Sequence, residues 1–166
     1  LGRSSKLDRS FAPIIYLTYP IPKIALLPIA MLLFGIGESS KIFLITLIIV
    51  FQILISVRDS TKKIPTEYFE PLISLGADRF EIFRSIIFPA VLPEFLTSIR
   101  ISLATAISVL FFTETFGTKF GMGFYIFDAW QRIDYLEMYS GIVVLSLIGL
   151  AMFVLIDLIE KFLVKW

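Results

Sequence analysis

The sequence predicts an all-α protein that crosses a membrane several times as a polytopic helical bundle. Hydrophobic residues make up 57% of the 166 residues, charged residues make up only 17%, and the mean hydropathy is +0.89. These values lie outside the range of ordinary soluble domains. Helices are the expected elements, because a helix satisfies its own backbone hydrogen bonds in lipid. The length leaves room for one membrane domain, residues 1–166.

About four spanning helices are predicted, because four apolar segments approach the length that a bilayer requires. They are residues 10–37, 42–57, 94–113 and 138–156. The first contains four prolines, which predict a kinked or re-entrant approach leading into a span. The second is uncharged for 16 residues, and we expect Lys41 and Arg58 to snorkel and extend it at both ends. The last holds 19 uncharged residues.

The distribution of basic residues predicts the orientation, because lysine and arginine are retained on the cytoplasmic side. Before the first span lie the basic residues Arg3, Lys6 and Arg9, and after the last span lie Lys161 and Lys165. Loop 58–93 contains Arg58, Lys62, Lys63, Arg79 and Arg84. The opposite loops offer only Lys41, Lys119 and Arg132. Both ends and loop 58–93 are therefore predicted to be cytoplasmic, and segment 116–137 to be an outward-facing cap with one short helix.

Several enzyme classes are disfavoured by what the sequence lacks. It contains neither cysteine nor histidine, which removes thiol nucleophiles, imidazole bases and most zinc or haem ligation, so no metal or cofactor is expected. No Walker-type run is present, so this chain is not expected to hydrolyse ATP. A lipid-modifying transferase or an intramembrane protease would need polar residues that meet within the bilayer, and the predicted spans offer no histidine and no aspartate pair.

The most informative stretch is the charged loop 58–93, which lies between strongly apolar segments. Pro65 suits the first turn of a helix, and Gly76 is a natural stop for it. Asp78 followed by Glu81 predicts a capping box that starts a second helix. One face of that helix up to Pro89 is apolar, with Phe80, Phe83, Ile86 and Ile87. The pattern predicts a helix, a glycine corner and a second, amphipathic helix.

The order Glu70, Gly76, Ala77, Ile86 and Pro89 resembles the cytoplasmic EAA loop of permease subunits in binding-protein-dependent ABC importers. Residues 20–42, 75–100 and 113–126 resemble corresponding parts of the nitrate, sulfonate and taurine permease family. Pro71 and Leu72 stand where the motif has two alanines. Proline there leaves the carbonyl of Glu67 without a helical donor, which predicts a first helix that is bent or begins later.

The resemblance implies a type I ABC importer permease in the cell inner membrane. It implies that a cytoplasmic ATP-binding subunit contacts the coupling residues Glu70, Gly76, Ala77, Asp78, Ile86 and Pro89. It also implies an external solute-binding protein, a homodimer of permease subunits, no cofactor and no nucleic-acid partner. Family members have further N-terminal spans, and Leu1 is not a start methionine, so an N-terminal part is expected to be missing.

The substrate and two alternatives remain open at this point. A sulfonate, nitrate, taurine or a related small solute fits the resemblance, and so does a thiamine-pyrimidine precursor. A truncated non-transporting paralogue or a membrane scaffold is the alternative to a working importer.

Two charged residues within the spans are candidates for the pathway or its gate. Glu114 lies at the outer end of its span, where an acid acts either in an outer gate or as the structural partner of a neighbouring polar group. Arg100 lies near the cytoplasmic start of the same span, where it either snorkels to the interface or attracts an anion along the pathway.

Overall fold

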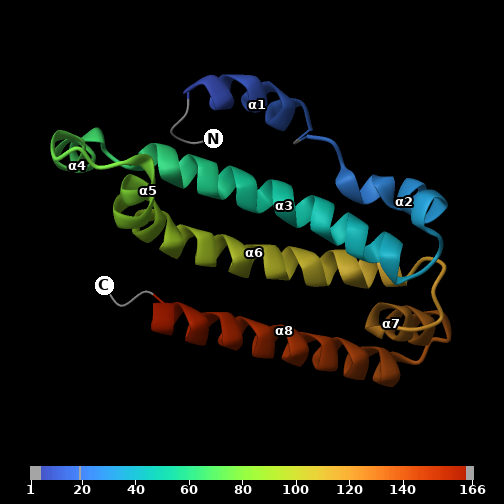
Figure 1. Cartoon of the computed structure of the whole chain (residues 1–166). Coiled ribbons are helices and arrows are strands. Elements are labelled where there is room, and N and C mark those ends of the chain that lie inside the picture. The colour runs from blue at the N-terminus through green and yellow to red at the C-terminus, as the bar shows by residue number, and fades with distance from the viewer. Residues whose placement is uncertain (1–4, 19, 164–166) are drawn as a thin grey trace. The chain divides into compact units, whose positions relative to one another are not determined.

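The computed structural model describes residues 5–18 and 20–163, and within them the regular structure is helical, with no strand (Figure 1). The α-helices are α1 (Ser5–Thr18), α2 (Leu27–Phe34), α3 (Glu38–Lys63), α4 (Glu70–Ser74), α5 (Arg79–Ile82), α6 (Phe88–Glu114), α7 (Met122–Gln131) and α8 (Tyr135–Leu163). Short 3₁₀ turns cover Lys23–Leu26 and Thr66–Tyr68, and a π-helical turn covers Phe83–Ile87. The predicted all-α fold is confirmed.

Three helices in the described part of the chain are long and apolar enough to cross a membrane: Glu38–Lys63, Arg79–Glu114 and Tyr135–Leu163. With 26 residues, α3 is about 39 Å long at roughly 1.5 Å per residue, which exceeds the ~30 Å hydrocarbon core. The three helices contain the predicted spans 42–57, 94–113 and 138–156 and extend beyond each of them. Most apolar side chains of α8 are exposed, as expected for a helix that faces lipid.

The remaining predicted span, residues 10–37, is divided into shorter helices. The first, α1, has 14 residues and ends at Thr18, and the apolar helix Lys23–Phe34 is also short of a full span. Pro20 and Pro22 lie between them, and each lacks the N–H that a continuous helix needs. The described residues therefore hold three candidate spans where the sequence predicts about four.

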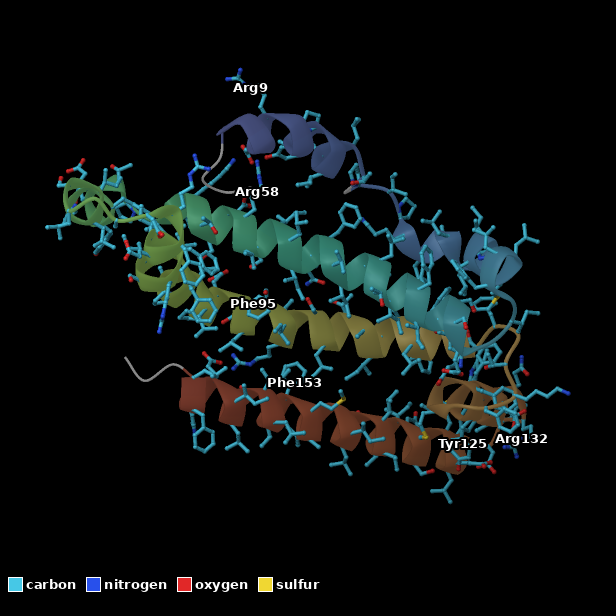
Figure 2. All side chains as sticks on the ribbon, in the orientation of Figure 1. Arg9, Arg58, Phe95, Tyr125, Arg132 and Phe153 are labelled. Atoms are coloured by element: carbon cyan, nitrogen blue, oxygen red, sulfur yellow. The ribbon has the colours of Figure 1, made fainter. Side chains whose placement is uncertain are left out.

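Two compact units divide the chain, and the first comprises Leu1–Ile21, Phe51–Ile99 and Glu160–Trp166. In this unit α1 lies beside the end of α3 (Figure 1), where Asp8 pairs with Arg58 at 2.5 Å and with Lys62 at 2.6 Å. The side-chain hydrogen bond from Arg58 is the main cause that lowers the pKa of Asp8 to about 2. The buried Arg58, labelled in Figure 2, thus pairs with α1, and the prediction that it snorkels is wrong.

The second unit comprises Pro22–Val50 and Arg100–Ile159. Its apolar core joins α2, α3 and α6 through Leu27, Leu44 and Val109. The short helix predicted within 116–137 is present as α7. Beyond it, Arg132 pairs with Asp128 at 2.9 Å and with Glu137 at 2.6 Å, and both carboxylates, Glu137 first, raise the pKa of its guanidinium. These ion pairs span the turn between α7 and α8.

Arg3 and Lys165, two of the basic residues behind the orientation prediction, lie outside the described residues.

Candidate functional site

The first helix of loop 58–93 begins later than its opening proline, as Pro71 predicts. Pro65 precedes only a 3₁₀ turn, Thr66–Tyr68, and the α-helix begins at Glu70. Pro71 lies in the first turn of α4, where a missing N–H removes no helical hydrogen bond. Glu70 is exposed in the same turn, where a carboxylate interacts favourably with the helix dipole.

Gly76 forms the predicted corner after α4. Its φ is +78°, in the left-handed region that favours glycine. The Gly76 N–H donates to the carbonyl of Ile73 at 3.0 Å, and the Ala77 N–H donates to that of Leu72 at 2.9 Å. Together these bonds form a Schellman motif, which satisfies the carbonyls at the end of the helix.

The second helix starts with the predicted capping box. The Glu81 N–H donates to the Asp78 carboxylate at 2.7 Å, and the Asp78 N–H donates to the Glu81 carboxylate at 2.9 Å. Capping bonds therefore restrain the chain on both sides of Gly76, so that the loop consists of two short helices with a fixed corner between them.

The predicted end of the second helix at Pro89 is wrong, because the helix continues into the membrane span. Arg79–Glu114 forms 36 consecutive helical residues, and Pro89 lies in the first turn of α6. A π-helical turn, Phe83–Ile87, directly precedes it. A wider turn is a common adjustment where a proline ring meets the preceding carbonyls. The second helix of the loop and the span are thus one continuous helix.

The coupling residues predicted from the resemblance lie in two places within the first unit. Glu70, Gly76, Ala77 and Asp78 form the corner just described, and all except the half-buried Ala77 are exposed. Ile86 and Pro89 instead line a groove of about 620 Å³. The other residues of this groove are Ser60, Lys63, Ile64, Pro65, Tyr68, Leu72, Ser85 and Ala90. Ile86 and Pro89 therefore face the same groove as Ser60 and Lys63 at the end of α3.

Large apolar side chains surround the corner and face solvent. The exposed fractions are 57% for Ile73, 85% for Leu75 and 67% for Phe80. They lie beside the charged side chains of Glu70 and Asp78, which are also exposed. An apolar surface with a polar rim is typical of a protein interaction site.

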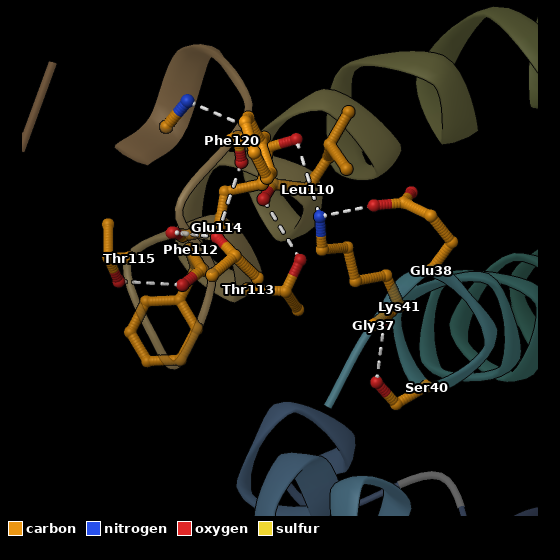
Figure 3. Close-up of polar contacts among 12 residues, drawn as sticks. Gly37, Glu38, Ser40, Lys41, Leu110, Phe112, Thr113, Glu114, Thr115 and Phe120 are labelled. Atoms are coloured by element: carbon orange, nitrogen blue, oxygen red, sulfur yellow. Dashed lines mark hydrogen bonds and ion pairs between the residues drawn. The ribbon is translucent and has the colours of Figure 1, made fainter. Parts of the chain in front are cut away.

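In the second unit, Glu114 is buried at the end of α6 and has two partners (Figure 3). One carboxylate oxygen accepts a 2.7 Å hydrogen bond from the Gly123 N–H at the start of α7. The other lies 3.8 Å from the ammonium of Lys41 on α3, which also donates a 2.7 Å hydrogen bond to Glu38. The side chain of Lys41 is only 3% exposed, so the prediction that it snorkels is wrong. This contact joins three helices.

Arg100 forms an ion pair between helices of the same unit. Its guanidinium lies 2.5 Å from the carboxylate of Asp157 on α8, and its side chain is 29% exposed. A buried or partly buried cation is stabilised by such a partner.

Comparison with known proteins identifies the family of the chain. Residues 1–166 match the family described as "Binding-protein-dependent transport system inner membrane component". The chain belongs to this permease family. It is 32% identical to the taurine transport system permease protein TauC of Escherichia coli (strain K12). The alignment of 166 residues covers 100% of this chain and 60% of TauC. Identity is 29% with the formylaminopyrimidine transport permease protein ThiX of Halalkalibacterium halodurans, over 98% of this chain and 65% of ThiX.

A third relative of this permease family is the riboflavin transport system permease protein RibX of Chloroflexus aurantiacus. It is 31% identical over 96% of this chain and 60% of RibX. The chain thus spans 60–65% of the length of these three relatives. The predicted resemblance to the nitrate, sulfonate and taurine branch is confirmed, since an aliphatic sulfonate permease and a nitrate permease are also among the matches.

The sequence of this permease did not indicate the ion-pair partners of its buried charges. Asp157 follows the uncharged run of α8, and an acid at the edge of a span requires a partner. The sequence thus indicated that Asp157 has a partner, but not that the partner is Arg100. Asp8 and Lys41 gave no comparable signal, because each lies at a predicted membrane boundary where charges are ordinary.

Proposed function

We propose that this chain is the transmembrane permease subunit of an ABC importer of the inner membrane. It forms part of the solute pathway as one membrane domain, residues 1–166, and a separate cytoplasmic ATPase hydrolyses ATP. Both ends and loop 58–93 face the cytoplasm, an external solute-binding protein delivers the solute, and a second permease copy completes the pathway. Membership of the permease family supports the transport role. The excess of lysine and arginine before the first span, in loop 58–93 and after the last span supports the orientation.

The observation that carries the proposal is the exposed apolar surface at the Gly76 corner. Leu75 and Phe80 flank the glycine and are largely exposed, although they lie among charged residues. We assign this surface to the ATPase contact, with Glu70, Gly76, Ala77 and Asp78 in direct contact. Apolar side chains supply buried area there, and Glu70 can form a charge-assisted hydrogen bond to a basic partner.

The same geometry explains how movement of the ATPase would reach the membrane. The corner is restrained on both sides by capping bonds, so it resists bending when the partner moves. Its second helix is continuous with the span as far as Glu114. Ile86 and Pro89 share a groove with Ser60 and Lys63 at the end of α3, and we propose that displacement reaches a second span at this groove. ATP-driven closure of the ATPases would therefore tilt the spans as rigid bodies.

Glu114 and Arg100 are assigned to the walls and gate of the pathway. Each is held by an ion pair to another helix, Glu114 to Lys41 and Arg100 to Asp157. We propose that they maintain the helix positions that shape the pathway. An anionic solute would be repelled by the Glu114 carboxylate, which argues against direct contact there.

The solute class is inferred from the relatives. Their names refer to taurine, formylaminopyrimidine, riboflavin, aliphatic sulfonates and nitrate. A small sulfur- or nitrogen-containing organic solute or anion is therefore proposed.

The test is a charge series at Glu70 in the importer assembled from the full chain, its ATPase and its binding protein. Glu70→Gln keeps an oxygen that can accept a hydrogen bond but loses the charge. The difference between a charged and a neutral hydrogen bond is about 1–1.5 kcal/mol, so ATPase affinity should fall roughly 5- to 13-fold. Glu70→Lys should weaken it further through like-charge contact. Membrane levels should stay unchanged, because Glu70 is exposed.

ATP-driven solute uptake into vesicles is measured beside the affinity. Uptake should fall in the same order as docking. Normal docking and uptake in both variants would contradict the coupling assignment. Absence of uptake by the wild-type importer, with the complex assembled, would favour the non-transporting scaffold instead.

A further inference from the structure

The second unit contains a buried ion pair whose cation has no role in the proposed coupling. The Lys41 ammonium lies 3.8 Å from one oxygen of Glu114, and their side chains are 3% and 10% exposed. Its hydrogen bond to Glu38 is shorter, at 2.7 Å, but the side chain of Glu38 is 75% exposed. Water therefore screens the contact with Glu38, whereas the contact with Glu114 is shielded from it.

The second oxygen of Glu114 holds the start of α7. It accepts a 2.7 Å hydrogen bond from the Gly123 N–H, and that contact is buried. A Cβ at Gly121 would overlap the Glu114 carboxylate, and one at Gly123 would overlap a backbone carbonyl of α6. Gly121 thus leaves the space that the carboxylate occupies, and Gly123 allows the start of α7 to approach the backbone of α6. One acid therefore closes the turn between α6 and α7 (Figure 3).

The orientation of this carboxylate depends on Lys41. An ionised carboxylate with one hydrogen bond in a buried site is strongly unfavourable unless a cation compensates it. Among the described residues, Lys41 is the basic side chain paired with Glu114. Without it, a carboxylate that stays ionised would rotate towards water and release the Gly123 N–H.

We propose that Lys41 is a positioning residue, which holds Glu114 so that its carboxylate fixes the glycine turn to the start of α7. The role concerns the shape of this end of the permease. Its effect on uptake rests on the proposed function, whereas its effect on the turn does not.

The experiment measures amide hydrogen exchange of the peptide 116–124 in the assembled importer. Lys41→Met should speed exchange of the Gly123 amide at least about tenfold, because it leaves the buried carboxylate uncompensated. Glu114→Gln retains an oxygen that can accept the Gly123 bond. The double variant Lys41→Met/Glu114→Gln removes both charges and should return exchange to within about threefold of wild type.

Two matched variants separate charge from packing. Lys41→Arg keeps the cation and should stay within about threefold of wild type. Lys161→Met makes the same change at an exposed lysine at the end of α8 and should have no effect on this peptide.

Exchange at the wild-type rate in Lys41→Met, or equally fast exchange in the double variant, would overturn the proposal. If Lys41→Met does not assemble, recovery of assembly in the double variant supports the proposal, and failure of both overturns it. Normal docking and uptake in the Glu70 variants, together with fast exchange in Lys41→Met, would contradict the coupling assignment and support the role of Lys41.

Discussion

Substitution of Gly76 provides the sharpest test of the corner, because the structure separates backbone strain from steric clash. A Cβ at Gly76 would meet nothing within 4 Å, so a side chain has room. The φ of +78° is nevertheless unfavourable for an L-residue, by roughly 1–2 kcal/mol. Asparagine tolerates this region and valine does not. Gly76→Val should therefore strain the corner, and Gly76→Asn should largely preserve it.

The strain should directly weaken docking of the ATPase that we propose as the partner of the corner. With five residues, α4 is far shorter than the ~12–15 residues at which an isolated helix becomes marginally stable. The corner thus has little stability in reserve, and a penalty of 1–2 kcal/mol lowers the docking-competent population about 5- to 30-fold. Apparent affinity for the ATPase falls by the same factor in Gly76→Val. The expected loss in Gly76→Asn is below about threefold.

The assay is a titration of purified ATPase against the full-length permease in lipid nanodiscs. Gly37→Val is the matched control, because Gly37 also has open space around its Cβ position but has no left-handed φ. It should leave the affinity unchanged. Equal losses in Gly76→Val and Gly76→Asn would show that the corner conformation does not govern docking, and so would the absence of any loss.

Two other predictions concern ion pairs between helices. Arg100→Met and Asp157→Asn should each lower the unfolding temperature in detergent. Because both side chains are partly exposed, the double-mutant cycle should give a coupling energy of about 0.5–1 kcal/mol. Additive losses of stability would show that the two residues do not form a stabilising ion pair. The pKa of Asp8 falls from 3.8 to about 2 in the folded chain, so its stabilisation is present above pH 3.8 and disappears as the pH falls through about 2. Thermal melts across that window should show this loss in the wild type and not in Asp8→Asn, and identical pH profiles would contradict it.

Local sequence patterns were enough to predict the corner in loop 58–93. Gly76 and the Asp78–Glu81 capping box depend on contacts within a few residues, and the structure contains both. Pro71 likewise acts on its own turn, and α4 begins late as expected. The continuation past Pro89 was not predictable in the same way. It depends on a π-helical turn, for which the sequence offers no pattern of its own.

The contacts of Lys41 and Arg100 could not be predicted from spacing. Their partners Glu114 and Asp157 lie on other helices, and only the packing of the spans brings them together. Snorkelling was the natural prediction for Lys41, because its position in the sequence marks a membrane boundary. The snorkelling prediction considers only lipid and water as surroundings of the Lys41 ammonium. A neighbouring helix is a third possibility, and in a bundle it offers a carboxylate at a fixed place.

Exposed apolar side chains have opposite meanings in the spans and in the loop. Those of α8 belong to an apolar helix of 29 residues, and lipid covers them without loss. Leu75 and Phe80 cannot be covered in that way, because burying them in hydrocarbon would also bury the carboxylates of Asp78 and Glu81. Those carboxylates are bonded to each other's backbone N–H and are fixed beside the apolar surface. A partner with an apolar groove and a polar rim satisfies both groups, and this favours a protein at the Gly76 corner.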